Sequence, residues 1–257
     1  MKELEAINAL DLAFVVDTTG SMSGLIETAK DQMVAMLTRL TQTAQVAIDM
    51  RLGVVEYRDH PPQERSFVYN VHPFTGKMKD AQRMINELGL GGGGDLPEAV
   101  FDGILGACRE LEWREHARRL LVLVGDAPPH GVGTKGDSFA KGCPCGETIE
   151  SVTAAAEEAS ITIYALGMRQ EANDSFTRIS QATGGEFFAT ARNEDAIARL
   201  QAILVKEFSQ IDFDRRLLAL WQTQHSLDVL AEQLASSRPA VAVAISRLGA
   251  RGLLQII

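Results

Sequence analysis

Cysteine is scarce in this sequence of 257 residues, which contains three: Cys108, Cys143 and Cys145. An odd number of cysteines, two of them one residue apart, does not fit the disulfide framework of a small secreted domain. Long apolar runs are also missing near the start, where acidic residues interrupt the one early apolar stretch. That stretch fits neither a signal peptide nor a membrane span, so we expect a cytoplasmic protein without a membrane segment.

Positive charge is in deficit. The chain has 25 Lys and Arg residues against 34 Asp and Glu residues, a net charge of -9 at pH 7. Residues 212–257 hold five arginines against four acidic residues, so the net negative charge lies entirely in residues 1–211. An acidic body argues against broad nucleic-acid binding there and is compatible with a cation site.

The signatures of several enzyme classes are missing. The glycine run at 91–94 lacks the following Gly-Lys-Ser/Thr of a phosphate-binding loop, and Asp95 stands where a phosphate would approach. No serine or cysteine lies in a recognisable nucleophile context, and the histidines show no base-and-orienter pattern. We therefore expect a protein that is not an enzyme, with metal-assisted hydrolysis as the enzymatic alternative.

Apolar, β-rich runs alternate with helical stretches through most of the chain. This alternation predicts an α/β fold, a doubly wound and mainly parallel sheet with helices on both faces. The segment "RDHPPQER" between the second and third strands is too short for a crossover helix, so these two strands should be antiparallel. The expected strands are 12–16, 49–57, 66–71, 120–124, 161–166 and 186–189, and the expected helices include 23–40, 97–111 and 194–210.

The stretch from 127 to 146 is rich in glycine and proline and predicts an irregular loop. His130, Cys143 and Cys145 share this loop and are residue types that bind zinc. The single residue between the cysteines and the lack of a fourth ligand favour a mobile loop with free thiols instead. Cys108 has apolar neighbours on a predicted helix and is expected in the core.

Oxygen-bearing side chains follow the first predicted strand. Asp17 ends the strand, and Thr19 and Ser21 alternate behind it, while Asp126 ends the strand "LLVLVGD" and should lie beside them. Carboxylates and hydroxyls suit Mg²⁺, with Mn²⁺ or Ca²⁺ as alternatives. Asp95, at a helix start after the glycine run, should face the same crevice. The competing interpretation is that the hydroxyls only cap the helix and Asp17 is a turn residue.

Four motifs, "DTTGSM", "EYRDHPP", "GGGGDLPEAV" and "GDAPPHG", together resemble the von Willebrand factor A domain with its metal-ion-dependent adhesion site. They are most similar to an intracellular and bacterial subgroup related to the domains of α-kinase-type and hemicentin-type proteins. The resemblance covers about residues 10–211. It implies that Asp17, Thr19 and Ser21 form the first metal loop and Asp126 the third, with hydroxyls bound directly and carboxylates partly through water.

Asp95 stands where the family has a threonine, and this departure has an electrostatic consequence. A third carboxylate would overneutralise a divalent ion, so an acidic group from a partner would be attracted less strongly. "YRDHPP" should lie on the same rim, where Arg58, Asp59 and His60 are expected to contact a protein partner together with His130. The alternative for this turn is a solvated, salt-bridged hairpin.

Residues 212–257 predict three short helices, at 215–221, 228–235 and 239–248. The last two, joined by "SSRP", resemble the helix-turn-helix of bacterial MarR-like winged-helix regulators, with residues 252–254 beginning the wing. Ser237, Arg238 and Arg247 are the candidate DNA contacts. The other outward positions are mostly alanine and valine, and the small net charge would release few counterions, so protein contact or dimerisation is preferred.

The sequence thus predicts a von Willebrand A-type domain over 1–211 and a helix-turn-helix or winged-helix-like module over 212–257. The predicted function is an intracellular, metal-dependent interaction or regulatory protein that engages a protein partner at a Mg²⁺ rim. The helix before the module would relay a signal through a hinge near 212–214. The alternative is a DNA-binding transcriptional regulator whose first domain senses a partner.

Overall fold

The computed structural model describes residues 6–44 and 47–255, and its centre is a six-stranded sheet of order β3-β2-β1-β4-β5-β6. All neighbouring strands are parallel except β3, which runs antiparallel to β2 as predicted. The α/β, doubly wound fold class is therefore confirmed. The strands are β1 Ala9–Asp17, β2 Asp49–Tyr57, β3 Tyr69–Thr75, β4 Arg118–Gly125, β5 Ile161–Gly167 and β6 Phe187–Ala189.

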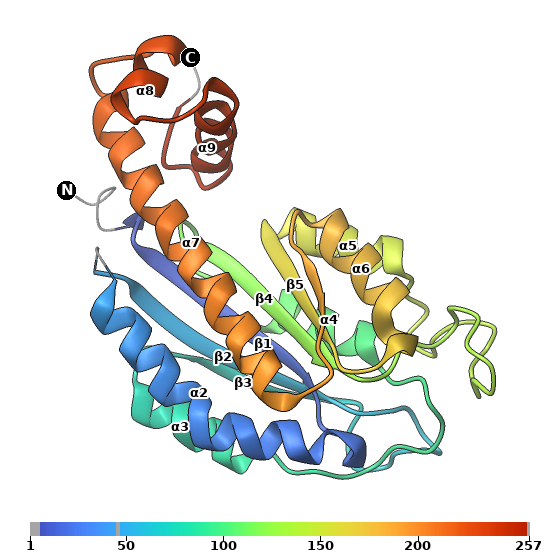
Figure 1. The fold of residues 1–257 in the computed structure, drawn as a ribbon. Helices are drawn as coiled ribbons and strands as arrows, with labels where there is room; N and C mark the ends of the chain where they lie inside the picture. Colours follow the sequence, from blue (N-terminus) through green and yellow to red (C-terminus); the bar gives the residue numbers. More distant parts are fainter. Residues whose placement is uncertain (1–5, 45–46, 256–257) are drawn as a thin grey trace.

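Helices cover both faces of the sheet (Figure 1). Alternate residues of β1 point to opposite faces, so Phe14 packs with α2, α3 and α7, while Val15 packs with α4, α5 and α6. All nine residues of β1 are buried, which is why the strand reads as an apolar run. The helices on the two faces are α2 Ser23–Thr43, α3 Met78–Glu87, α4 Val100–Glu110, α5 Ile149–Glu158, α6 Asn173–Ala182 and α7 Asn193–Trp221.

Helix α4 begins later than the predicted start at Pro97. The backbone N–H of Glu98 donates to Pro128 O at 3.0 Å, and that of Ala99 donates to Arg58 O at 2.8 Å. These two residues are therefore tied to neighbouring loops, and Ala99, with φ -78° and ψ 51°, is not helical, so the helix begins at Val100.

The two helices predicted at 194–210 and 215–221 form one continuous helix, α7. The polar stretch between them does not break the helix, because Asp214 is 1% exposed and accepts hydrogen bonds from the guanidinium of Arg247 on α9. The expected hinge near 212–214 is therefore wrong, and the predicted domain boundary at 211/212 falls inside α7.

A small module follows α7 at the end of the sheet opposite the carboxyl ends of the strands (Figure 1). Its helices α8, Leu227–Gln233, and α9, Arg238–Ala250, form an apolar cluster with the end of α7 and with Ile7. Arg251 donates to Ile7 O at 2.9 Å and to His116 O at 3.0 Å, which fastens the module to the start of β1 and the loop before β4.

The expected wing is not formed over residues 252–254. The backbone turns at Gly252, whose φ is +66°, and Leu253 N donates back to Leu248 O at 3.0 Å. Leu253 and Leu254 are buried in the apolar cluster of the module, so these residues close a helix instead of beginning a strand. Residues 256 and 257 lie outside the described residues. Over residues 6–44 and 47–255, no helix combines the length and apolar character needed to cross a membrane.

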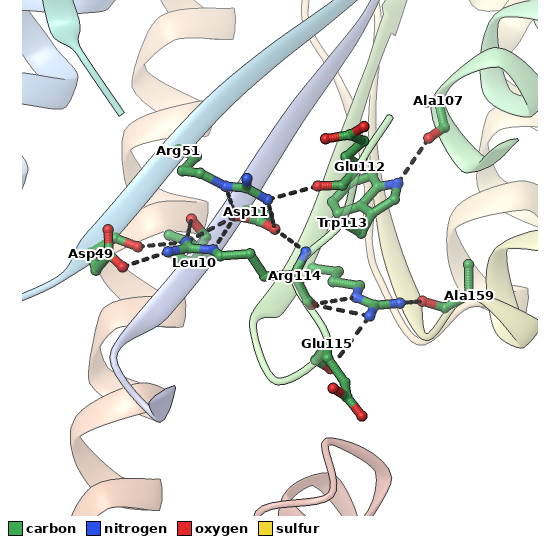
Figure 2. Close-up of polar contacts among 11 residues, drawn as sticks. Leu10, Asp11, Asp49, Arg51, Ala107, Glu112, Trp113, Arg114, Glu115 and Ala159 are labelled. Atoms are coloured by element: carbon green, nitrogen blue, oxygen red, sulfur yellow. Dashed lines mark hydrogen bonds and ion pairs between the residues drawn. The ribbon is translucent and has the colours of Figure 1, made fainter. Parts of the chain in front are cut away.

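A buried charge network joins the amino-terminal ends of the strands (Figure 2). The Asp11 carboxylate is 0% exposed and accepts two hydrogen bonds from Arg51, at 2.9 and 2.7 Å. It also accepts from the backbone N and the Nε of Arg114, which itself reaches Leu10 O and Asp49. This network links β1, β2 and the loop before β4, and so helps to fix the register in which their opposite ends meet.

Helix α7 is attached to the sheet by Glu207, whose side chain is 0% exposed. It accepts hydrogen bonds from Arg118 at 2.8 and 3.2 Å and from the Tyr164 hydroxyl at 2.5 Å. Burial by itself raises the pKa of Glu207, but the charge and hydrogen bonds of Arg118 and Tyr164 outweigh it and leave the pKa below its ordinary value. The carboxylate therefore contributes stability in its ionised form.

Glu207→Gln is expected to lower the free energy of unfolding by about 3 kcal/mol, because Arg118 then lies against the core without its counter-charge. Urea unfolding measures the loss. The difference should be present above about pH 4.5, the ordinary pKa of a glutamate, and should shrink as the pH falls through the lowered folded pKa. The control Glu186→Gln removes a half-exposed pair with Lys206 and should cost less than about 1 kcal/mol. Equal losses in the two variants would contradict this assignment.

Candidate metal centre

Four of the predicted metal ligands lie together at the carboxyl end of the sheet. Asp17 ends β1, and its Oδ1 accepts hydrogen bonds from Thr19 N at 2.8 Å and Thr19 Oγ1 at 2.6 Å. Thr19 Oγ1 lies 3.2 Å from Ser21 Oγ, which donates to Asp126 Oδ1 at 3.1 Å. Because β1 and β4 are adjacent and parallel, Asp17 and Asp126 meet at the same edge, as the sequence predicts.

Thr19, Ser21 and Asp126 border a pocket of about 380 Å³, and Asp17 lies directly behind Thr19, to which it is hydrogen-bonded. Asp95 borders it too, so the structure places the fifth predicted ligand at the same pocket. Asp95 Oδ2 accepts a hydrogen bond from Ser138 N at 2.7 Å, whereas Asp95 Oδ1 is buried without a hydrogen-bond partner. The lining residues are Thr19, Gly20, Ser21, Gly92, Gly93, Gly94, Asp95, Leu96, Glu98, Asp126, Ala127 and Arg169.

Glu98 belongs to the site but was not predicted from the sequence. Its side chain borders the pocket and is 4% exposed. It lies three residues after Asp95 in the same "GGGGDLPEAV" motif, where an acidic residue directly before an apolar helical run was the available signal. The predicted helix start at Pro97 pointed to Asp95, which directly precedes that helical turn. In the structure, backbone hydrogen bonds hold Glu98 at the rim, before α4 begins.

Three buried carboxylate oxygens around this pocket lack a hydrogen-bond partner. They are Asp17 Oδ2, Asp95 Oδ1 and Glu98 Oε2. Buried polar atoms are nearly always paired in folded proteins. Three unpaired carboxylate oxygens at one place therefore indicate a binding site for a positively charged group that these oxygens can coordinate. Carboxylate and hydroxyl oxygens are the preferred ligands of hard divalent cations. The residues present therefore fit such a cation.

The electrostatics of the site agree with this fit. Burial, together with the repulsion of Asp126, outweighs the lowering effect of the Thr19 hydrogen bonds and raises the pKa of Asp17 to about 7. Burial and the repulsion of neighbouring carboxylates, Asp17 first, raise the pKa of Glu98 to about 10. Among the described residues, the one ion pair of these carboxylates with an arginine joins Asp126 Oδ2 to Arg169 Nε at 3.1 Å. Arg169 is half exposed, so it offsets little of the buried charge.

The residues predicted to contact a partner on the rim are inside the protein. Arg58 is 8% exposed and donates to Gly89 O at 2.9 Å, to Ser66 Oγ at 2.8 Å and to Glu64 at 3.2 Å. The guanidinium also lies over the Phe67 ring. The prediction that Arg58 contacts a partner directly is therefore wrong, because its bonds are directed inward to support the glycine-rich segment.

Asp59, His60 and His130 are likewise buried, with exposures of 0%, 6% and 1%. His130 Nε2 lies 2.7 Å from Asp59 Oδ1, and its Nδ1 lies 2.8 Å from Asp137 Oδ1. Both ring nitrogens of His130 are thus engaged beneath the surface. The prediction that these three side chains contact a partner directly is therefore also wrong, because all three are buried where the loop 127–146 packs against the segment after β2.

The loop itself is irregular, as predicted, but its cysteines do not pair with His130. The side chain beside them is that of His60. Cys108 packs against the core from α4 and stays partly exposed.

The predicted DNA contacts are engaged within the small module. Ser237 Oγ accepts from Ala240 N at 3.3 Å and caps α9. Arg238 is exposed and pairs with Asp228 at 3.1 Å. Arg247 is 17% exposed and bound to Asp214. The prediction that Arg247 contacts DNA is therefore wrong, because its guanidinium is paired with a buried carboxylate of the protein itself.

Replacing each of two buried glutamates, Glu98 and Glu64, by glutamine should affect the stability of the metal-free protein differently. Glu98→Gln is expected to change the unfolding free energy in EDTA by less than about 1 kcal/mol, because a carboxyl group with a pKa of about 10 is already neutral at pH 7. It should weaken Mg²⁺ binding at least about 10-fold, measured by isothermal titration calorimetry.

The matched control is Glu64→Gln, which removes a carboxylate that accepts from Arg58, Arg65 N and Ser66 N. This variant should lose about 1 to 3 kcal/mol of stability even in EDTA, because hydrogen bonds to an ionised group are lost. Mg²⁺ affinity unchanged by Glu98→Gln would remove Glu98 from the metal centre.

Comparison with known proteins agrees with this fold. The family model of the von Willebrand factor type A domain matches residues 11–203. The alpha-protein kinase vwkA of Dictyostelium discoideum is 29% identical over 153 residues, 59% of this chain and 24% of that protein. A putative ariadne-like RING finger protein of Acanthamoeba polyphaga mimivirus is 29% identical over 134 residues, 51% of this chain and 12% of that protein. The chain thus matches less than a quarter of the length of either relative.

Solved structures show the same fold at low sequence identity. Proximal thread matrix protein 1 of the mussel byssus has a TM-score of 0.54 at 17% identity, covering 77% of this chain and 45% of that one. A form of that protein with a zinc-occupied metal-ion-dependent adhesion motif has a TM-score of 0.54 at 16% identity, with the same coverage. The pilus adhesin SpaC of Lactobacillus rhamnosus GG has a TM-score of 0.58 at 13% identity, covering 79% and 30%. With the family model spanning most of its length, this chain belongs to the von Willebrand factor type A domain family.

Proposed function

We propose that this protein is a non-enzymatic interaction module that binds a divalent cation and engages a protein partner at the cation's rim. The observation that carries the proposal is the set of three buried, unpartnered carboxylate oxygens around one pocket. Mg²⁺ is the first candidate, with Mn²⁺ or Ca²⁺ as alternatives, because every side chain offered is a hard oxygen donor. The residues that would hold it, the hydroxyls directly and the carboxylates partly through water, are Asp17, Thr19, Ser21, Asp95, Glu98 and Asp126.

When bound, the cation neutralises the buried carboxylates and offers a coordination position to an oxygen atom of the partner. The protein's own residues shape the approach. Gly92, Gly93 and Gly94 are exposed at the rim, so a partner can come close to the backbone there. Gly92 has φ +73°, a conformation that residues with a Cβ rarely adopt, and a Cβ on it would lie 2.0 Å from Glu64 Oε2 and displace that carboxylate from Arg58.

Two features support binding over catalysis. The Ser21 hydroxyl donates to Asp126, and no histidine or cysteine is among the residues lining the pocket. A nucleophile with a neighbouring base is the usual requirement for covalent catalysis. We also propose protein contact, not DNA contact, for the small module, since Arg247 and Arg238 already pair with Asp214 and Asp228.

The course of α7 supports a regulatory role. The helix begins at Asn193, whose side chain lies against Gly24 at the start of α2, close to the first metal loop. It ends in the apolar cluster of the small module. We propose that cation or partner binding at the rim biases the position of α7 and so reaches the module. The free cysteines agree with the cytoplasmic location expected from the sequence.

Metal-dependent capture tests the binding proposal. Immobilised protein in Mg²⁺ should retain a partner from extract of its own cells and release it in EDTA. Asp17→Asn should lose the partner, because it removes a ligand charge while keeping the side chain's shape. The matched control Asp31→Asn changes an exposed carboxylate on α2 and should retain the partner. Retention of the same partner by Asp17→Asn, or in EDTA, would overturn the proposal.

Hydrogen exchange tests the relay. Adding Mg²⁺ should change amide protection in the last turns of α7, residues 214–221, as well as at the metal loops, because one helix connects the two places. Mass spectrometry of peptides from α7 and from α3, which does not reach the module, gives the measurement and its control. Protection confined to the metal loops would rule out the relay while leaving metal binding intact.

A further inference from the structure

Four side chains outside the metal centre converge beneath the loop 127–146. They are His60 from the segment after β2, Asp102 from the first turn of α4, and Cys143 and Cys145 from the loop. One ligand atom from each lies within 4.8 Å of all the others. His60 and Cys143 are buried, Asp102 is 9% exposed and Cys145 is half-buried. Residues distant in the sequence thus bring two sulfurs, a nitrogen and an oxygen to one point.

The separations among these atoms match a shared centre. His60 Nε2 lies 3.0 Å from Asp102 Oδ2 and 3.2 Å from Cys143 Sγ. Cys143 Sγ lies 3.0 Å from Cys145 Sγ and 3.5 Å from Asp102 Oδ2. A tetrahedral zinc ion with ordinary bond lengths separates its ligand atoms by about 3.3 to 3.8 Å. The separations among the His60, Asp102 and Cys143 atoms are within about 0.4 Å of the values expected for their own ligand types. The two sulfurs, which belong at the upper end of that range, are about 0.8 Å too close and would move apart on binding.

The orientation of His60 distinguishes a metal site from a catalytic relay. In a relay, the imidazole uses one ring nitrogen for the nucleophile and the other for the carboxylate. Here the same atom, Nε2, faces both the Asp102 carboxylate and the Cys143 sulfur. His130 shows the contrasting case, since Asp59 and Asp137 each take one of its nitrogens. Of these two histidines, His60 is therefore the one that presents a single nitrogen to a common centre.

We propose that His60, Asp102, Cys143 and Cys145 bind a zinc ion, separate from the cation of the metal centre. Two thiolates and an imidazole favour zinc, whereas the metal centre offers only oxygen. Four protein ligands fill a tetrahedral shell and leave no open position, as in structural zinc sites. The site is thus structural, and its ligands join the loop to α4 and to the segment after β2.

The loop needs such a fixed point. Residues 126–148 are all described and form only turns and one isolated bridge. Within the loop, Ser138 N donates to Asp95 Oδ2, and Gln63 Nε2 donates to Ser138 Oγ at 2.7 Å. The loop therefore positions a carboxylate of the metal centre. Zinc at one end of the loop would hold the rim in the conformation that a partner meets.

Cobalt substitution tests the proposal on the full chain. With thiols kept reduced, titration with Co²⁺ should give a thiolate-to-cobalt charge-transfer band and the strong visible bands of tetrahedral cobalt, saturating at about one ion per chain. Zn²⁺ should abolish both. Protein expressed with zinc should retain about one zinc ion per chain after gel filtration. A wild-type protein with neither the thiolate band nor bound zinc would overturn the proposal.

Variants assign the ligands. Cys143→Ser and Cys145→Ser should abolish or strongly weaken the thiolate band, and His60→Gln should lower cobalt affinity by more than about 100-fold, beyond the usual effect of an outer-shell partner. Cys108→Ser removes the third cysteine, which lies outside the cluster, and should leave the band unchanged. Asp17→Asn should also leave it unchanged, because that carboxylate belongs to the metal centre. Loss of the band with Cys108→Ser or Asp17→Asn, or a Cys143–Cys145 disulfide in the protein as purified, would overturn the assignment.

Discussion

Repulsion among buried carboxylates is the constraint on which this end of the protein depends. Asp17, Glu98 and Asp126 are each at most 5% exposed, and Asp95 is close by at the same pocket. A half-exposed arginine is a weak counter-charge, so the group must take up either protons or a cation. The surrounding polar bonds are directed to holding the carboxylates in place and not to neutralising them. That arrangement is costly for a protein that only needs to fold, and reasonable for one that must bind a cation.

Two metal chemistries lie on either side of one loop. The metal centre offers carboxylate and hydroxyl oxygens, and the cluster at Cys143 and Cys145 offers sulfur and nitrogen, so ligand softness separates the ions without a difference in size. The bond between Ser138 N and Asp95 connects the two sides. A closed zinc site fixes backbone, while an open oxygen site can exchange ligands with a partner. With zinc bound, the irregular loop would form a fixed part of the rim despite having no helix or strand of its own.

The fold, and the meeting of Asp17, Thr19, Ser21 and Asp126 at one end of the sheet, could be predicted because they depend on local patterns. Apolar runs mark buried strands, and parallel neighbours bring the strand ends carrying Asp17 and Asp126 together. The missed features depend on contacts between distant segments. The buried position of Arg58 depends in part on the carbonyl of Gly89 from another loop, and the continuity of α7 requires Arg247 to neutralise Asp214. The neighbour of the loop cysteines is His60 from another segment. Sequence spacing cannot show such partners, and so the sequence did not reveal which side chains lie beside the cysteines.

The contact of Arg251 with Ile7 has a practical consequence for handling the protein. It brings residues from near both ends of the chain to the pole opposite the metal pocket. A fluorophore or surface anchor attached to an exposed side chain at this pole would therefore leave the rim facing solution. Proteins immobilised in this way would present the pocket in a uniform orientation, which suits single-molecule or biosensor measurements of weak, ion-dependent association.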